Sequence, residues 1–203
     1  MRLARIGPKG GEEPVVVDPK TSRLVLVGSE VGDFDRPWAA SGGYAELKGL
    51  YASIERGTDG LPRVHPDEAG RFGPPIVPAK IRCVGQNYAK HAREGGNPLP
   101  EEPPIFNKDA DSAAGPNDPL PMPPGVTMDL HWRPNAKEAR VEIGLPRGCA
   151  ALDYEVEKAF VTLESAHGVS PEAIEREYPR YILGYVAMND VSQRDWQLRT
   201  IGG

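Results

Sequence analysis

Short apolar segments separated by polar turns dominate the first third of the chain and predict a small sheet. Short apolar runs that alternate with turn signals predict three strands, at Arg2–Ile6, Pro14–Val17 and Leu24–Val27. Asp18-Pro19-Lys20 is a turn signal between the last two strands, because Pro fixes φ and Asp can accept bonds from the backbone just beyond it. Helical spacing follows over Ala45–Ile54. We therefore expect residues 1–70 to form a small N-terminal domain.

A Gly- and Pro-rich segment over residues 71–79 predicts a linker, and residues 80–203 then read as a second, larger domain. Its predicted strands are Ile81–Val84, Pro104–Lys108, Tyr154–Leu163 and Tyr181–Met188. Its predicted helices are Tyr88–Glu94, a helix that Ser170-Pro171 opens and Pro179 ends, and Val191–Arg199. Strands and short helices in this mixture predict an α+β fold.

Composition narrows the class of protein. The 203 residues include 23 Gly and 22 Pro, too many for a helical bundle, and they lack the period of collagen. The net charge is −5 and no block of Lys and Arg occurs, so neither nucleic acid nor an anionic membrane surface is an expected partner. No apolar run approaches the roughly 18 residues of a membrane span, and the N-terminus lacks a secretory signal. Two cysteines, Cys83 and Cys149, make no disulfide framework, which indicates the reducing cytoplasm.

The first candidate for chemistry is the pair Glu155 and Glu157. Side chains two apart on a strand share one face, so both carboxylates can reach one cation. Oxygen ligands suit Mg²⁺, Mn²⁺ or Ca²⁺ better than Zn²⁺. A solvated strand face is the ordinary alternative, but Ala159 and Val161 continue the same face and suggest partial burial. Buried carboxylates need a compensating cation to stay ionised.

Two further candidates stand at the ends of predicted elements. Asp190 follows the apolar strand, where it can either join the two Glu residues or cap the next helix. His91 and Glu94 are three residues apart on a predicted helix and so share a face. A carboxylate beside imidazole raises its basicity, as a general base requires, although a plain surface pair has the same spacing. The chain has no P-loop or nucleotide-binding glycine motif, which leaves nucleotide cofactors unsupported.

Three ordered blocks together resemble the fumarylacetoacetate hydrolase family. They are KIRCVGQNYAKHAREGG with the segment to Gly125, LDYEVEKAFV (Leu152–Val161) and GYVAMNDVSQRDWQ (Gly184–Gln197). The opening RLARIGPKG resembles the small N-terminal domain of bacterial members. The resemblance implies a mostly-β roll, a homodimer, and activity on short 2-oxo or 2,4-dioxo acids.

The resemblance also implies roles for individual residues. Glu155, Glu157 and Asp190 would hold Mg²⁺ or Mn²⁺, with Ca²⁺ as a third candidate. His91 and Glu94 would activate water, and Lys108 and Gln197 would line the substrate site. The implied reaction is hydrolysis of a carbon–carbon bond in acylpyruvate- or fumarylpyruvate-type acids. Decarboxylation of oxaloacetate, or a lyase or isomerase reaction on the same metal site, is the alternative.

The sequence departs from the family pattern in three places, of which one is the strand KAFVTL, where relatives have a more apolar run. Relatives continue well past the position of Gly203, so we expect an incomplete roll that lacks the C-terminal part of the family domain. Residues 127–150 resemble an insertion before the strand that carries the two Glu residues. A truncated member without catalysis, or a binding module in which His91 is dispensable, therefore remains an alternative to the enzyme.

Overall fold

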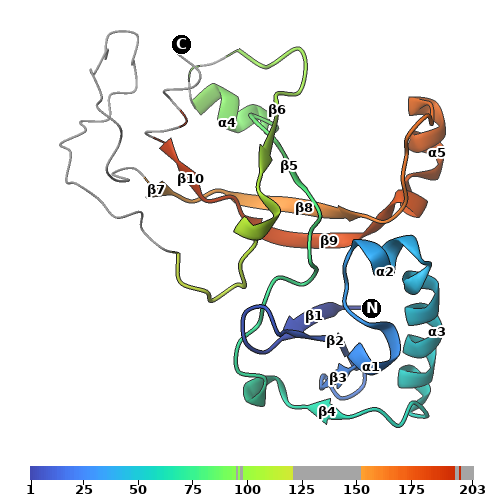
Figure 1. Cartoon of the computed structure of the whole chain (residues 1–203). Helices are drawn as coiled ribbons and strands as arrows, with labels where there is room; N and C mark the ends of the chain where they lie inside the picture. Colours follow the sequence, from blue (N-terminus) through green and yellow to red (C-terminus); the bar gives the residue numbers. More distant parts are fainter. Residues whose placement is uncertain (95, 97, 121–151, 195–196, 198–203) are drawn as a thin grey trace. The chain divides into compact units, whose positions relative to one another are not determined.

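The computed structural model describes residues 1–94, 96, 98–120, 152–194 and 197 (Figure 1). The segment 127–150, which the sequence suggests is an insertion, lies outside the described residues. The chain divides into two compact units. The first comprises residues 1–118 and 163–167, and the second comprises residues 119–162 and 168–203.

The first unit begins with a four-stranded antiparallel sheet, called here the N-terminal sheet, in the order β1-β2-β3-β4 (Figure 1). Its strands are β1 (Leu3–Ile6), β2 (Glu13–Val17), β3 (Leu24–Leu26) and β4 (Arg63–Val64). The three predicted strands are confirmed to within one residue at each end, and β4 was not predicted. The turn before β3 is also confirmed, because Asp18 Oδ1 accepts a hydrogen bond of 2.8 Å from the Lys20 N–H.

Three helices follow β3: α1 (Gly28–Val31), α2 (Arg36–Ala40) and α3 (Gly43–Arg56). The α3 helix extends the predicted Ala45–Ile54 at both ends, and it buries Leu47 and Ile54 at helical spacing. The helix is capped by Gly57, whose φ of 75° is left-handed and lets the Gly57 N–H bond to Ile54 O. Helices and sheet thus share a core built from apolar side chains of both.

Residues 71–73 extend the N-terminal sheet instead of beginning a linker. The Gly7 N–H donates to Arg71 O (2.9 Å) and the Gly73 N–H donates to Arg5 O (2.8 Å). The Arg71 side chain is paired with Asp118 Oδ1 at 2.7 Å, so a later segment is held to the same place. The predicted linker at residues 71–79 therefore lies inside the first compact unit, because its first residues pair with β1.

The remainder of the first unit carries a hairpin and short helical turns. β5 (Ile81–Val84) pairs antiparallel with β6 (Ile105–Lys108), and α4 (Ala89–Glu94) lies between them in sequence. The short 3₁₀ turns η1 (Pro66–Glu68) and η2 (Ala110–Ser112) flank this region. Both strands and the helix agree with the sequence-based expectation to within one residue.

The second unit is built on a long antiparallel pair, β8 (Val156–Thr162) with β9 (Ile182–Asn189), called here the β8–β9 ribbon (Figure 1). A second pair joins β7 (Leu152–Asp153) to β10 (Ser192–Gln193). The helix α5 (Pro171–Tyr181) begins where predicted, because the Ser170 side chain accepts a bond from the Ala173 N–H (3.3 Å).

Two expected boundaries in this unit are wrong. Pro179 does not end α5, which continues to Tyr181. A proline in the last turn removes one N–H and frees a carbonyl that solvent can reach, which limits its cost there. The expected helix Val191–Arg199 begins instead as β10, because Ser192 pairs with Asp153 of β7.

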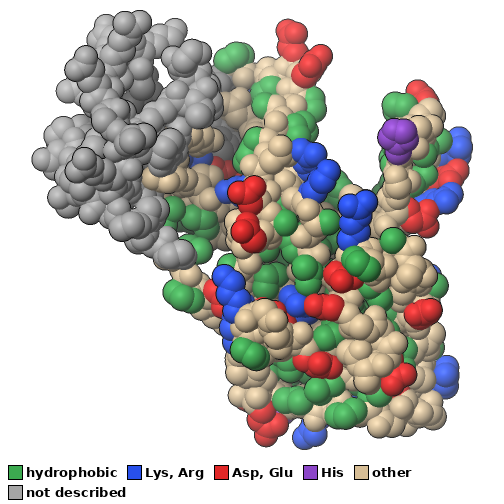
Figure 2. Space-filling view, in the orientation of Figure 1, with side chains coloured by type: hydrophobic (Ala, Val, Ile, Leu, Met, Phe, Trp, Pro, Cys, Tyr) green, Lys and Arg blue, Asp and Glu red, His purple; other side chains and the backbone are tan. Residues whose placement is uncertain are grey.

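Helices and strands alternate irregularly along the chain, and the predicted α+β class is confirmed. No helix among the described residues is long and apolar enough to cross a membrane. On the face shown in Figure 2, acidic and basic side chains are interspersed over the N-terminal sheet and its helices.

Candidate active site

The two predicted metal-binding glutamates lie on one side of the β8–β9 ribbon. Glu155 immediately precedes β8 and Glu157 belongs to it, and both are partly buried, as are Ala159 and Val161 further along the same face. The opposite face is open, with Val156 81% exposed. The alternation expected of a strand therefore gives the two carboxylates a shared, more sheltered face.

Asp190 lies directly beside Glu155. Its N–H donates to Glu155 O (2.8 Å), and Asn189 Oδ1 accepts from the Glu155 N–H (3.1 Å). Both backbone polar groups of Glu155 are thus bound, one by Asn189, which ends β9, and one by Asp190, which follows it. Asp190 is buried, with 4% of its surface exposed. Glu157 lies opposite Met188 of β9 in the strand register. The backbone bond brings Glu155 and Asp190 together, and the role of Asp190 as a cation ligand stays a prediction.

Arg194 is bound to the side chain of Glu155. Its Nη2 is paired with Glu155 Oε1 and with Asp153 Oδ2, the latter at 2.9 Å, and its Nη1 donates to Gln197 Oε1 at 2.8 Å. Burial would lower the pKa of the guanidinium, but its bonds to Asp153 and Glu155 outweigh this and raise that pKa. Arg194 is therefore a permanent positive charge at the end of the β8–β9 ribbon.

The donor chemistry of this region fits a hard cation. Three carboxylates lie on or beside the paired strands, and carboxylate oxygens are the ligands that Mg²⁺ and Mn²⁺ prefer. Across the described part of the chain, however, no group of three His, Cys, Asp or Glu side chains is close enough to hold an ion, and the Oε1 atom of Glu155 faces Arg194. The residue types fit Mg²⁺ or Mn²⁺, and their assignment as ligands stays a prediction.

The predicted general base lies in the first compact unit. His91 and Glu94 both belong to α4, so their backbone positions are three residues apart on one helix, as predicted. Their side chains lie outside what the structure describes. The helix follows β5 through Gly85 and Gln86, and Gln86 adopts a left-handed φ of 48°, which is uncommon for a residue with a side chain.

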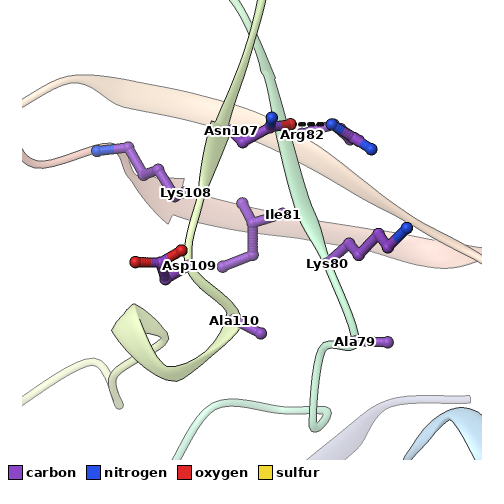
Figure 3. A pocket seen from close by; sticks show the side chains of 8 residues that line it. All are labelled: Ala79, Lys80, Ile81, Arg82, Asn107, Lys108, Asp109 and Ala110. Atoms are coloured by element: carbon purple, nitrogen blue, oxygen red, sulfur yellow. Dashed lines mark hydrogen bonds between the residues drawn. The ribbon is translucent and has the colours of Figure 1, made fainter.

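Lys108, the other predicted site residue of the first unit, ends β6 opposite Ile81 of β5. It lines a pocket of about 250 Å³ together with Lys80, Arg82 and Asn107 (Figure 3). The Arg82 Nη1 donates to Asn107 Oδ1 across the hairpin. The Lys80 and Lys108 side chains point away from each other (Figure 3), so they do not converge on one anion.

Sequence reasoning missed three residues that contact Glu155 or its partner: Asp153, Asn189 and Arg194. Asp153 and Arg194 stand 41 positions apart, so no local periodicity links them. The only available signal was their position, two residues before Glu155 and three before Gln197.

Comparison with known proteins identifies a family model and curated relatives that match this chain. The family model described as fumarylacetoacetate (FAA) hydrolase C-terminal matches residues 80–201. A Burkholderia multivorans protein named as a proposed hydrolase is 31% identical over 202 residues, which are 100% of this chain and 59% of that protein. A similarly named protein of Burkholderia lata is 30% identical over the same share of both chains. The chain thus spans less than two thirds of the length of these relatives.

Solved structures are similar to this chain in fold. A Mycobacterium smegmatis structure, titled as a provisional HpcE protein, matches 98% of this chain and 57% of its own with a TM-score of 0.62 and 26% identity. A fumarylacetoacetate hydrolase from Exiguobacterium antarcticum matches 99% of this chain and 59% of its own, with a TM-score of 0.59 and 23% identity. The second likeness bears on the fold alone.

Proposed function

The chain belongs to the fumarylacetoacetate hydrolase family, and we propose that it carries part of an enzyme that hydrolyses a carbon–carbon bond in short 2,4-dioxo acids. The substrates would be of acylpyruvate or fumarylpyruvate type. The observation that supports this most directly is the backbone bond from Asp190 to Glu155, which brings two of the three predicted cation ligands together.

Glu155, Glu157 and Asp190 would hold Mg²⁺ or Mn²⁺. When bound, such a cation supplies Lewis-acid polarisation to a 2-oxo carboxylate group and offsets negative charge that develops beside it. The sheltered face of the β8–β9 ribbon favours this role, because carboxylates with little access to water gain more from a cation than solvated ones do.

His91 would remove a proton from water, with Glu94 holding the imidazole in the required tautomer. The resulting hydroxide adds to the distal carbonyl carbon of the substrate. The bond between that carbon and the adjacent CH₂ group then breaks and leaves the enolate of a 2-oxo acid. The enolate takes up one proton, so one water is consumed and two acids are released.

Lys108 and Gln197 would contact the substrate, Lys108 as a cation for its carboxylate and Gln197 through its amide. The same enolate arises when oxaloacetate loses carbon dioxide. A decarboxylase, or a lyase or isomerase on the same site, is therefore the alternative reaction, and a direct comparison of substrates decides between them.

The experiment that tests the cation site is a thermal melt with and without millimolar Mg²⁺ or Mn²⁺, repeated with oxalate as an enolate mimic. Binding to the native state raises the melting temperature by mass action. Glu155→Gln should abolish the shift with metal, whereas Glu175→Gln, at an exposed position of α5, should retain it. A melting shift in Glu155→Gln equal to that of the original chain would refute the assignment.

The role of His91 is tested separately by turnover. His91→Ala should remove hydrolysis of acylpyruvates while the metal-dependent melting shift persists. His167→Ala, at an exposed turn, is the matched control and should behave as the original chain does. Full turnover in His91→Ala would exclude the general-base role, and release of carbon dioxide from oxaloacetate without acylpyruvate hydrolysis would favour the decarboxylase.

A further inference from the structure

The segment that carries β5, α4 and β6 leaves the N-terminal sheet and later returns to it. It leaves after Gly73, whose N–H donates to Arg5 O (2.8 Å). It returns at Asp118, whose carboxylate accepts two bonds of 2.7 Å from Arg71, one from Nε to Oδ1 and one from Nη2 to Oδ2. Arg71 and Asp118 are 47 positions apart in sequence. One ion pair therefore closes a long loop at its base.

The Arg71 guanidinium is also held on its other side. Its Nη1 donates to Glu12 Oε1 (2.7 Å) and to Gly7 O (3.0 Å), so all three nitrogens of the side chain are engaged. The Glu12 side chain is 4% exposed and that of Asp118 is 14% exposed, so water competes little for these bonds. A planar guanidinium bound at both ends presents its fork to a carboxylate in one direction. The ion pair at the base of the loop is thus sheltered and fixed in geometry.

A close backbone contact fixes the same end of the loop a second time. The Gly115 N–H donates to Asp118 Oδ2 (2.7 Å). A Cβ atom at position 115 would overlap the carbonyl oxygen of Phe72, so glycine is the residue that fits there. Because Phe72 follows Arg71, both contacts hold residues 115–118 against the same two residues of the first unit.

Closed turns fill the short stretch between β6 and the ion pair. The Ser112 N–H donates to Asp109 O (3.0 Å), and the Asp118 N–H donates to Gly115 O (3.2 Å). Only two residues separate these turns. β6 ends immediately before the first turn and is paired with β5 along its whole length. The position of Asp118 is thus transmitted to the β5–β6 hairpin through a stretch with few free torsions.

We propose that Arg71, Asp118 and Gly115 form a clasp that closes residues 71–118 into one loop and positions α4 within it. α4 carries the predicted general base His91, so the positioning role rests on the proposed function, whereas closure of the loop does not. The predicted cation ligands belong to the second unit, outside this loop. Opening the clasp should therefore impair catalysis by His91 and leave the binding of Mg²⁺ or Mn²⁺ unchanged.

The first arm of the test measures hydrogen exchange by mass spectrometry in the full 203-residue chain and needs no ligand. Asp118→Asn should accelerate exchange of β5 and β6 by roughly tenfold, the effect of weakening one hydrogen bond between charged groups. The matched control is Asp59→Asn, which breaks an ion pair of the same 2.7 Å length to Arg63 that spans only four positions. The open loop retains that pair, so Asp59→Asn should leave exchange of β5 and β6 unchanged.

Two results of this arm would overturn the clasp. One is unchanged exchange of β5 and β6 in Asp118→Asn. The other is equal acceleration of β5 and β6 by Asp118→Asn and Asp59→Asn, because these strands would then be exposed only when the whole unit unfolds.

A second variant opens the clasp without changing a charge. Gly115→Ala should accelerate exchange of β5 and β6, whereas Gly49→Ala on α3, where a Cβ atom meets nothing within 4 Å, should not. Together, Gly115→Ala and Asp118→Asn should exceed the larger single effect by less than about twofold, because both open the same clasp. Fully multiplicative effects would show two independent contacts and contradict a single clasp.

The last arm connects the clasp to the proposed function. Asp118→Asn should lower kcat for acylpyruvate hydrolysis by at least about tenfold, since a displaced base loses its reactive geometry, while Mn²⁺ affinity measured by calorimetry stays unchanged. Asp59→Asn should retain kcat. A parallel loss of Mn²⁺ affinity in Asp118→Asn would indicate general loss of the native structure and overturn the positioning role. If the original chain binds no Mn²⁺ and hydrolyses no acylpyruvate, the proposed function fails, and the exchange measurements alone decide whether the clasp closes the loop.

Discussion

The N-terminal sheet and the β8–β9 ribbon are both antiparallel, yet they bury their apolar residues very differently. In the N-terminal sheet Val15, Val16 and Val25 are fully buried, because α1 packs on β2 and α3 supplies Leu47 and Ile54 to the core. In the ribbon, whose strands the structure describes in full, no strand residue is buried. Phe160 and Tyr185 face each other across it and are 60% and 59% exposed.

This difference shows that the β8–β9 ribbon does not form a hydrophobic core of its own. A two-stranded sheet is at best marginally stable in water, and it needs further strands or a helix against one face. On the open face of the β8–β9 ribbon, which carries Phe160 and Tyr185, Lys158 Nζ lies 4.5 Å from the Tyr185 ring centroid. The part of the chain with the predicted cation ligands therefore depends on contacts beyond its two strands more than the N-terminal sheet does.

The ion pairs of the two regions also differ in which residues they contact. In the N-terminal region Arg5, Glu12 and Arg71 form a chain of ion pairs, in which Glu12 is 4% exposed and bound from both sides. These pairs tie β1 to later segments and touch no predicted site residue. In the second unit the comparable charges, Asp153 and Arg194, contact Glu155 and Gln197.

The largest expected effect on stability comes from a substitution in the hydrophobic core of the N-terminal region. Leu47→Ala should lower the free energy of unfolding by about 2–5 kcal/mol, the usual cost of a cavity at a fully buried leucine. Phe160→Ala should lower it by less than about 1 kcal/mol, since Phe160 is largely exposed and little of its surface leaves water. Urea unfolding followed by circular dichroism measures both. A loss for Phe160→Ala as large as that for Leu47→Ala would show that the outer face of the ribbon is covered in solution.

The same contrast explains which parts of the fold the sequence predicted. β1, β2, β3, β5 and β6 were predicted because each contains a short, locally visible run of apolar residues between turn or loop residues. β4 and β10 are two residues long and form by pairing with strands distant in sequence, so no local sequence pattern predicts them. The helix expected over Val191–Arg199 begins later than predicted for the same reason: Ser192 and Gln193 pair with β7, whereas Arg194 and Gln197 are helical.

The features of the candidate site also divide into those that local strand geometry predicts and those that depend on pairing between distant strands. The shared face of Glu155 and Glu157 follows from strand geometry, and the structure shows it. The bond between Asp190 and Glu155 needs the register of two strands about 30 residues apart, which the sequence does not contain. The Arg194 contacts need that register together with a second strand pair, and they were missed entirely.

A second prediction concerns the stability of the N-terminal region at acidic pH. The ion pair with Arg71, aided by the Gly115 N–H, lowers the pKa of Asp118 to about 2. Because this folded-state pKa is below the ordinary value of about 4, the stabilisation is complete above pH 4 and is lost as the pH falls toward 2. The urea midpoint of the N-terminal region should therefore fall between pH 4 and pH 2. Asp118→Asn should be less stable at pH 6 and show a smaller fall, and an unchanged acid profile in that variant would contradict the role of the pair.

The smallest expected effect concerns α5, which joins the two strands of the ribbon. Ser170→Ala removes the acceptor for the Ala173 N–H, and loss of a helix N-cap costs about 1 kcal/mol. Ser170→Asp keeps an acceptor there and should retain most of that stability. If the ribbon opens independently of the N-terminal sheet, Ser170→Ala should speed hydrogen exchange in α5 and β9 while amides of β2 and β3 stay protected. Equal acceleration of exchange in both regions would show that the two regions unfold as one cooperative unit, so that their different burial has no counterpart in stability.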